Sequence, residues 1–262
     1  MEYLFSAVET ILWALALVIP RIAVAMTLIP FLSRQVLPMT MVKNGIAISF
    51  GLMVLPTVYG FNPGEVGYAH AGLLILKEMI LGLLLGFLVA IPFWVIEGVG
   101  SFIDNQRGAT MSEMFNPMSG SETSSMGVLL NQTAAAIFVT TGGLLAFLGF
   151  LYSSYKLWPV MTFLPTFHVY QAKFFIDKLD YAMMLIIVLS APAIIAMFLS
   201  EFCFALVNRF AQQLNVFILS MPVKSAVALA ILFIYLNALF YFFDLYQDAF
   251  PLLLKQLERV VS

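Results

Sequence analysis

The stretch VLLNQTAAAIFVTTGGLLAFLGFLYSSY, residues 128–155, contains no charged side chain and is far longer than a β-strand. A helix needs about 20 predominantly apolar residues to cross a bilayer. Five other apolar runs reach or approach that length: Ile11–Leu32, Gly45–Tyr59, Met79–Ile96, Tyr181–Ser200 and Ser225–Phe243. None of them alternates as an outer-membrane strand does. The sequence therefore predicts an all-α, hydrophobic membrane protein of about six to eight long helices.

The composition of the whole chain is that of a protein surrounded by lipid or by other proteins. Of its 262 residues, 62% are hydrophobic and 10% are charged, and the mean hydropathy is +1.00. Soluble domains have about 45–50% apolar and about 25% charged residues. The net charge of −2 offers no basic surface for nucleic acid, so lipid and protein are the expected neighbours.

No arrangement of side chains in the sequence predicts catalysis. His70 and His168 stand alone, without a carboxylate at the spacing that binds a metal. Nucleophile, phosphate-binding and dinucleotide-binding motifs are absent from the sequence. Cys203 is the single cysteine, which excludes an internal disulfide and a cysteine-built metal site. We therefore expect no enzymatic activity, no catalytic residue, no metal and no cofactor.

A polar insert at residues 104–125, between two apolar runs, is the candidate functional segment. Gly108, Pro117 and Gly120 interrupt regular structure there. Methionine, which fills irregular gaps and repacks easily, recurs at Met111, Met114, Met118 and Met126. Irregular backbone at membrane depth needs surrounding protein or a wet cavity. The residues alone leave three interpretations open: a surface connection, a ligand site and a pore-facing loop.

Several charged residues lie within or beside the apolar runs. A charge at the bilayer centre costs about 2.5–3.5 kcal/mol, so it normally faces a partner or a wet cavity. We expect Arg21, which follows Pro20, and Lys224, which follows Pro222, to be paired or to face another subunit. We expect the glutamates at the ends of their runs to lie at the membrane interface: Glu78, Glu97 and Glu201.

Three local patterns lead to further expectations. Lys77 and Glu78 are adjacent, and adjacent helical residues do not face each other, so we do not expect them to pair. The spacing of Gly82 and Gly86 permits close helix packing, but chance explains so short a pattern at least as well. Asn131, at the start of an apolar run, is expected to form interhelical hydrogen bonds.

The segments between the runs predict where the helices end. These connections are Ser33–Asn44, Gly60–Glu78, Glu97–Gly127, Lys156–Asp180 and Glu201–Lys224. The last is expected to be helical with a break near Pro222, which leaves two C-terminal helices bent or folded against each other. Basic residues in alternate connections number five against six, a balance that sets no orientation. Two explanations stay open: the topology is weakly biased, or many of the helices pack against partner subunits rather than lipid.

Two ordered blocks of residues carry a family resemblance. The first is Pro92-Phe93-Trp94, Gly98, Asp104-Asn105-Gln106-Arg107-Gly108-Ala109 and Asn116-Pro117. The second is Glu201-Phe202, Arg209-Phe210-Ala211, Leu214-Asn215-Val216-Phe217 and Pro222-Val223-Lys224-Ser225. With these blocks most of the chain resembles the T subunit of the type III secretion export apparatus (the SctT/YscT family), the injectisome counterpart of flagellar FliR. It looks most like the Ysc-type branch.

The resemblance implies a core component of a protein-export gate. With the R and S subunits, and associated with the switch subunit U, it would form the channel that unfolded effector and needle proteins pass. It would be a multi-pass protein of the bacterial inner membrane, raised toward the periplasm when assembled, in contact with lipid and not with nucleic acid. The resemblance also implies two portions: residues 1–178, R-like and containing the insert 104–125, and residues 179–262, an S-like helical hairpin.

By position, the resemblance implies roles for particular residues. A channel plug would consist of Met111, Met114, Phe115, Asn116 and Pro117. The insert would be anchored by Asp104, Asn105, Gln106, Arg107 and Gly108, with charge-assisted hydrogen bonds from Asp104 and Arg107. Contacts with other subunits would come from Arg21, Glu201, Pro222 and Lys224.

Two other functions stay open. A polytopic secondary transporter would use Glu97, Glu201 and Lys224 as an ion relay and would act without partner subunits. A pure assembly scaffold would share the sequence blocks but would have no insert facing a channel.

Overall fold

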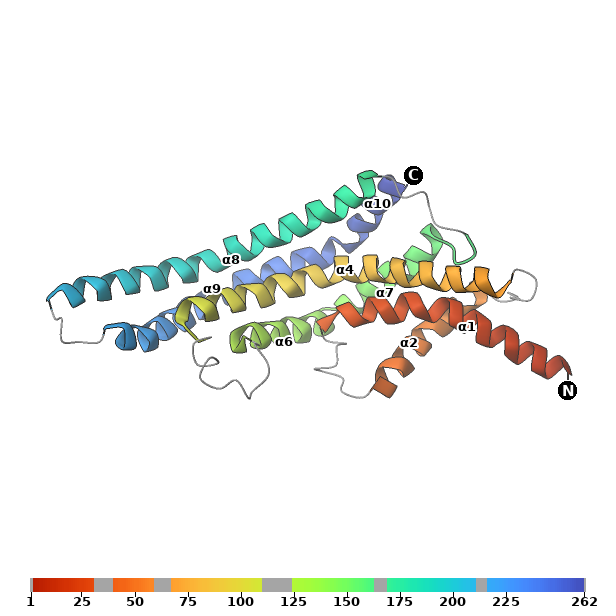
Figure 1. Cartoon of the computed structure of the whole chain (residues 1–262), viewed down its shortest axis with the longest axis horizontal. Coiled ribbons are helices and arrows are strands. Elements are labelled where there is room, and N and C mark those ends of the chain that lie inside the picture. Colours follow the sequence, from red (N-terminus) through yellow and green to blue (C-terminus); the bar gives the residue numbers. More distant parts are fainter. Residues whose placement is uncertain are drawn as a thin grey trace. The chain divides into compact units, whose positions relative to one another are not determined.

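The computed structural model describes residues 2–30, 40–58, 67–109, 124–162, 169–210 and 216–261. Within these ranges the chain forms eight α-helices and one short 3-10 helix, and no β-strand (Figure 1). The helices are α1 (Glu2–Leu28), α2 (Thr40–Val54), η2 (Leu55–Thr57), α4 (Tyr68–Arg107), α6 (Ser125–Thr140), α7 (Gly143–Leu157), α8 (Val169–Phe210), α9 (Val216–Asp248) and α10 (Phe250–Val261). The predicted all-α hydrophobic fold is confirmed.

Fewer helices of the described chain can cross a membrane than the six apolar runs suggested. Four are long and apolar enough: Val8–Leu28, Tyr68–Arg107, Lys173–Phe210 and Leu219–Tyr246. The run 128–155 is two helices, α6 and α7, bent by 76° at Gly142, whose φ of +89° suits glycine. The run Gly45–Tyr59 contributes to α2, whose 15 residues span only about 22 Å.

All five predicted connections are wrong at their ends, because helices extend into each of them. Asp104–Arg107 forms the last turn of α4. In the predicted connection Lys156–Asp180, the first two residues still belong to α7, and α8 already begins at Val169. α8 continues past Glu201 to Phe210. Pro222 lies inside α9 and does not end it, so the predicted break there is not found. Residues 211–215 instead separate α8 from α9.

The chain divides into two compact units. The first comprises Met1–Ile91, Val139–Lys178 and Gln247–Ser262, and the second Pro92–Phe138 and Leu179–Tyr246. In the second, Phe93, Phe138 and Phe243 form an edge-to-face cluster with ring centroids 5.1–6.2 Å apart. The division at residue 178 into R-like and S-like portions concerns relationship to other subunits and stays a prediction.

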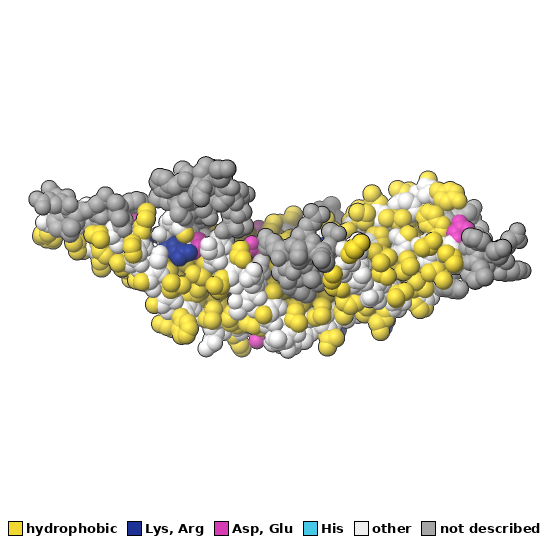
Figure 2. Space-filling model, turned by 90° about the horizontal axis from the view of Figure 1, so that it is seen from below, with side chains coloured by type: hydrophobic (Ala, Val, Ile, Leu, Met, Phe, Trp, Pro, Cys, Tyr) yellow, Lys and Arg dark blue, Asp and Glu magenta, His cyan; other side chains and the backbone are white. Residues whose placement is uncertain are grey.

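The helices differ in how much of their apolar surface the chain itself covers. Of the residues in the most apolar stretch of α4, 67% are buried, against 22% of those in the most apolar stretches of α8 and α9. Large side chains such as Phe198, Phe202 and Phe233 are exposed. Figure 2 shows one face of the described residues, on which hydrophobic side chains predominate and charged ones are few. These surfaces are suited to lipid or to other hydrophobic proteins.

Candidate functional site

The C-terminal part of α4 and the start of α6 pack as an antiparallel hairpin, which we call the α4–α6 hairpin (Glu97–Arg107 with Ser124–Asn131; Figure 1). At its centre the two backbones touch. A Cβ atom on Gly100 would lie 2.5 Å from both Cα and N of Gly127, and one on Gly127 would lie 3.0 Å from the carbonyl oxygen of Glu97. Glycine on both helices is therefore what allows this contact.

The carboxylate of Asp104 joins the two helices at the end of the hairpin. Its Oδ1 accepts a hydrogen bond from Nε of Arg107 at 2.8 Å. Its Oδ2 accepts bonds from Oγ of Ser124 at 2.6 Å and from the backbone N–H of Met126 at 2.9 Å. The carboxylate is buried and sits at the positive N-terminal end of α6, where a negative charge is stabilised. We call this arrangement the Asp104 clasp.

Both helix ends at the clasp are capped. Ser124 precedes α6, and its Oγ accepts a bond from the N–H of Gly127 at 2.8 Å, as an N-cap serine does. At the end of α4, Gly108 has φ of +82°. Its N–H donates to the carbonyl of Asn105, and the N–H of Ala109 donates to that of Asp104. These two bonds form the Schellman motif, so the residues that flank the insert are fixed.

The anchor residues expected from the sequence differ in what they do. The structure brings Asp104 and Arg107 together, and Gly108 ends the helix. Asn105 exposes its side chain and takes part through its carbonyl, while Gln106 is half-buried. Sequence reasoning missed Ser124 and the Met126 amide, although a serine just before an apolar run is a recognisable N-cap signal. The expected plug residues lie outside the described residues, and their role stays a prediction: Met111, Met114, Phe115, Asn116 and Pro117.

Further along the hairpin, Glu97 of α4 meets Asn131 of α6. The Asn131 amide Nδ2 donates to Oε2 of Glu97 at 2.7 Å, which confirms the interhelical bond expected for Asn131. Glu97 is half-buried, whereas Asn131 is buried. Oδ1 of Asn131 is also buried and has no hydrogen-bond partner.

The structure also brings together two of the residues expected to contact other subunits. Nζ of Lys224, on α9, lies 2.7 Å from Oε2 of Glu201, on α8. The lysine side chain is 10% exposed and that of the glutamate 46% exposed. The pair thus places a carboxylate at the surface of the second unit, while Pro222 lies two residues before Lys224 inside the same helix.

Arg21 occupies the centre of a buried network in the first unit. Its Nε lies 2.6 Å from Oε2 of Glu78, and a second guanidinium nitrogen lies 3.0 Å from Oε1. It also donates to Oγ of Ser154 and to the carbonyl of Trp158, and it stacks 4.0 Å above the ring of Tyr155. Arg21 is completely buried. In this conformation its side chain contacts only its own chain, and another subunit could not reach it.

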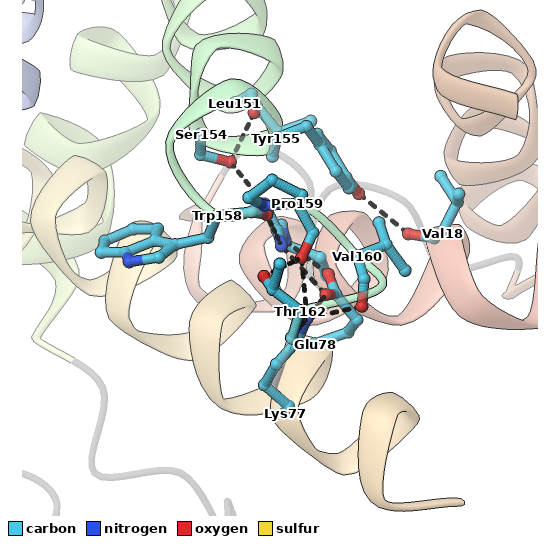
Figure 3. A network of polar contacts seen from close by, with 11 residues as sticks. Val18, Lys77, Glu78, Leu151, Ser154, Tyr155, Trp158, Pro159, Val160 and Thr162 are labelled. Carbon is cyan, nitrogen blue, oxygen red and sulfur yellow. Dashed lines mark hydrogen bonds and ion pairs between the residues drawn. The ribbon is translucent and has the colours of Figure 1, made fainter. Parts of the chain in front are cut away.

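Lys77 joins the same network from α4 (Figure 3). Its Nζ lies 2.8 Å from Oε1 of Glu78 and donates to the carbonyls of Pro159, Val160 and Thr162 at 3.2, 2.8 and 3.0 Å. The expectation that Lys77 and Glu78 do not pair is wrong, because the long lysine stem bends toward the carboxylate that Arg21 already holds. Glu78, which was expected at the membrane interface, is completely buried within the protein; its position relative to the interface stays a prediction.

Glycine makes this network possible as well. A Cβ atom on Gly82 would overlap the backbone carbonyl of Arg21, and one on Gly86 would lie 2.8 Å from Cα of Ala25. The two glycines of α4 therefore lie directly against α1. Chance does not explain their spacing, which lets the guanidinium of Arg21 and the carboxylate of Glu78 approach.

Comparison with known proteins identifies the family. Residues 12–249 match the family described as bacterial export proteins, family 1. Over 219 residues the chain is 45% identical to Yop proteins translocation protein T of Yersinia pestis, with 84% of each chain covered. It is 36% identical over 231 residues to secretion system apparatus protein SsaT of Salmonella typhimurium, with 87% of this chain and 88% of SsaT covered. Flagellar biosynthetic protein FliR of Bacillus subtilis is 27% identical over 228 residues, with 87% of each covered. The chain therefore belongs to the bacterial export proteins of family 1, and its resemblance to the T subunit of the type III secretion export apparatus is confirmed.

Proposed function

We propose that this protein forms, with R and S subunits, the closed channel through which unfolded proteins cross the inner membrane, and that residues 110–123 obstruct that channel. It would do so without catalysis, in association with the switch subunit U. Its apolar helices and its family make it a multi-pass inner-membrane protein. We also propose that the assembled protein is raised toward the periplasm and that Glu201 and Lys224 lie at a contact with another subunit.

The observation that carries the proposal is the Asp104 clasp. It holds the end of α4 and the start of α6 together, although Asp104 and Met126 are 22 residues apart in the chain. A segment whose two ends are fixed side by side can extend only half of its contour length. Residues 110–123 therefore reach at most roughly 25 Å from the clasp. That is enough to fill a channel beside the hairpin, and it restricts the obstruction to that place.

The charge distribution supports a channel protein better than a transporter. An ion relay through Glu97, Glu201 and Lys224 needs these groups to exchange ions in sequence. Among the described residues, Lys224 is bound to Glu201, whereas Glu97 is bound to Asn131. A transporter would also act alone, so co-purification of the chain with R and S subunits separates the two functions.

The test is a deletion that spares the clasp. Removing residues 110–120 while keeping Asp104, Arg107 and Ser124 should leave a complex that still co-purifies with the R and S subunits. Its conductance in a planar bilayer should rise from a closed baseline to a steady leak of ions, because the obstruction is gone while the hairpin remains.

A matched control replaces residues 110–120 by an equally long flexible segment of glycine and serine. This variant keeps the length and loses the bulk of the methionines and phenylalanine, so it should leak as well. An assembled deletion complex that stays as tightly closed as the natural one would refute the obstruction.

A further inference from the structure

The pair of Glu97 and Asn131 is an incomplete polar contact inside the α4–α6 hairpin. Asn131 gives one hydrogen bond to the carboxyl group of Glu97, at 2.7 Å. Its own Oδ1 is buried without a partner, and such an unpaired acceptor is costly because it has lost its water and gained nothing. Glu97 forms no ion pair with any described residue. A negative charge and an unpaired acceptor thus lie next to each other between two apolar helices.

Among the described residues, no charged side chain of the elements packed around Glu97 is paired with it. α6 carries no titratable side chain. α8 meets α4 where Ile186 contacts Gly98, and α9 meets it where Phe243 contacts Phe93. The titratable residue nearest in sequence to the contact on α8 is Tyr181, and the one nearest to the contact on α9 is Asp244. On α4 itself the nearest is Asp104, whose carboxylate is held in the clasp.

We propose that Glu97 is a proton-binding site of the packed hairpin. A carboxylic acid and a primary amide form a cyclic pair with two hydrogen bonds: the amide N–H donates to the carbonyl oxygen of the acid, and the acid O–H donates to the amide oxygen. The first bond is present. A proton taken from water onto the second oxygen of Glu97 supplies the other bond and removes the charge in the same step.

A proton fits this site better than a cationic side chain of a partner does. Asn131 Oδ1 is buried, so an ammonium or guanidinium group from outside cannot reach it without opening the hairpin. The hydrogen of a protonated Glu97 is already inside. Glu97 is half-buried, and its exposed side gives the proton a path to and from water.

Protonation then acts on the packing of α4 against α6. With the proton bound, the pair holds two hydrogen bonds and no charge. As the pH rises and the proton leaves, one bond is lost, Asn131 Oδ1 is again unpaired, and a charge lies between the helices. The hairpin is therefore tighter at low pH and looser at high pH. The proposal does not depend on what residues 110–123 do.

The direct test is infrared spectroscopy of the purified export complex in lipid, with isotope-labelled glutamate, at neutral pH. Glu97→Gln should remove the C=O band of one protonated carboxyl and leave the carboxylate bands unchanged. The matched control is Glu201→Gln, which should remove a carboxylate band, because Glu201 is ion-paired with Lys224. Loss of a carboxylate band in Glu97→Gln overturns the proposal.

A second variant keeps the test valid if Glu97→Gln assembles poorly. Asn131→Leu leaves the carboxyl in place and removes its amide partner. The protonated C=O band should then shift to higher frequency, as a carboxyl does when it loses hydrogen bonds. An unshifted band means that Glu97 and Asn131 are not the pair.

The effect on packing is read by spin labels on exposed sites of the two helices, Phe102→Cys and Leu129→Cys, with Cys203→Ala to remove the natural thiol. In the natural sequence the distance distribution should be narrow at neutral pH and broaden at alkaline pH. With Glu97→Gln, whose amide mimics the protonated acid and holds no titratable proton, it should stay narrow throughout. Equal broadening in both proteins overturns the proposal.

Discussion

The Arg21 network and the Asp104 clasp both place a carboxylate against a guanidinium beside a glycine contact, and they differ in burial. In the network, the side chains of Arg21 and Glu78 have no exposed surface. In the clasp, that of Arg107 is 19% exposed, although Asp104 is 2% exposed. The network joins segments far apart in the sequence, whereas the clasp joins two consecutive helices. The Arg21 network is therefore closed to water, whereas the Asp104 clasp is open to it on the side of Arg107.

The two regions also differ in how completely their donors are used. Three nitrogens of Arg21 bind partners on α4 and at the end of α7, and Lys77 binds three carbonyls. In the clasp, Arg107 contributes one bond, and the Asp104 carboxylate relies as much on a hydroxyl and a backbone amide. Removing one charge should thus be severe in the network and mild in the clasp.

The largest effect is expected from Glu78→Gln. It leaves Arg21 and Lys77 buried without an anion, a change that costs about 3–5 kcal/mol. Chemical unfolding of the purified protein in mixed micelles measures this cost. The matched variant Arg107→Met leaves the buried Asp104 carboxylate with its bonds to Ser124 and the Met126 amide, so it should cost less, about 1–3 kcal/mol. Equal losses in the two variants would remove the contrast between the regions.

A smaller loss is expected where the glycine contacts are filled. Gly82→Ala and Gly100→Ala each drive a methyl group into the backbone of a neighbouring helix, and overpacking of this kind costs about 1–3 kcal/mol. Both regions should respond alike, because the closeness of the helices is what they share. Gly72→Ala in α4 meets nothing within 4 Å and should stabilise the helix by about 0.5–1 kcal/mol. The same unfolding experiment compares the three, and a harmless Gly100→Ala would show that the hairpin is not closely packed.

The smallest effect is expected at the cap of α6. Ser124→Ala removes the oxygen that binds the Gly127 amide and the hydroxyl that binds Asp104, at a cost of about 1 kcal/mol. Amide hydrogen exchange should speed up at Gly127 and stay unchanged at residues 77–82 in the other unit. Ser125→Ala, at an exposed neighbouring position, serves as the control and should leave both rates unchanged. Faster exchange in both units would indicate a general loss of stability.

Hydrophobicity predicts which segments of this chain are helical, and contacts decide where the helices end. Polar residues such as Asp104 and Asn105 suggested a loop, yet α4 continues through them because α6 and Arg107 satisfy the carboxylate. Similarly, Gly142 divides a run without any charged residue, since a positive φ leaves no trace in hydropathy. A local pattern would have sufficed for Ser124, which has the position of an N-cap.

The pairings across the chain could not be predicted from the sequence. Arg21 and Glu78 are 57 residues apart, and neither has a neighbour that reveals the other. Arg21 lay in the middle of one apolar run and Glu78 at the edge of another. Gly82 and Gly86 were the one local trace of this contact, and so short a pattern also occurs by chance. The family resemblance identified the insert, but which atoms hold its ends is a matter of geometry.

Asp104 has a consequence for the order in which the chain is made. A negative charge at the C-terminal end of a helix opposes the helix dipole, and the same charge at an N-terminal end complements it. Asp104 is in the last turn of α4 and acts on the first turn of α6. The ribosome adds Met126 22 residues after Asp104, roughly 1–4 s later at usual rates of synthesis. During that time Arg107 compensates the charge of Asp104 within α4, and the last turn gains its further stabilisation once α6 has emerged.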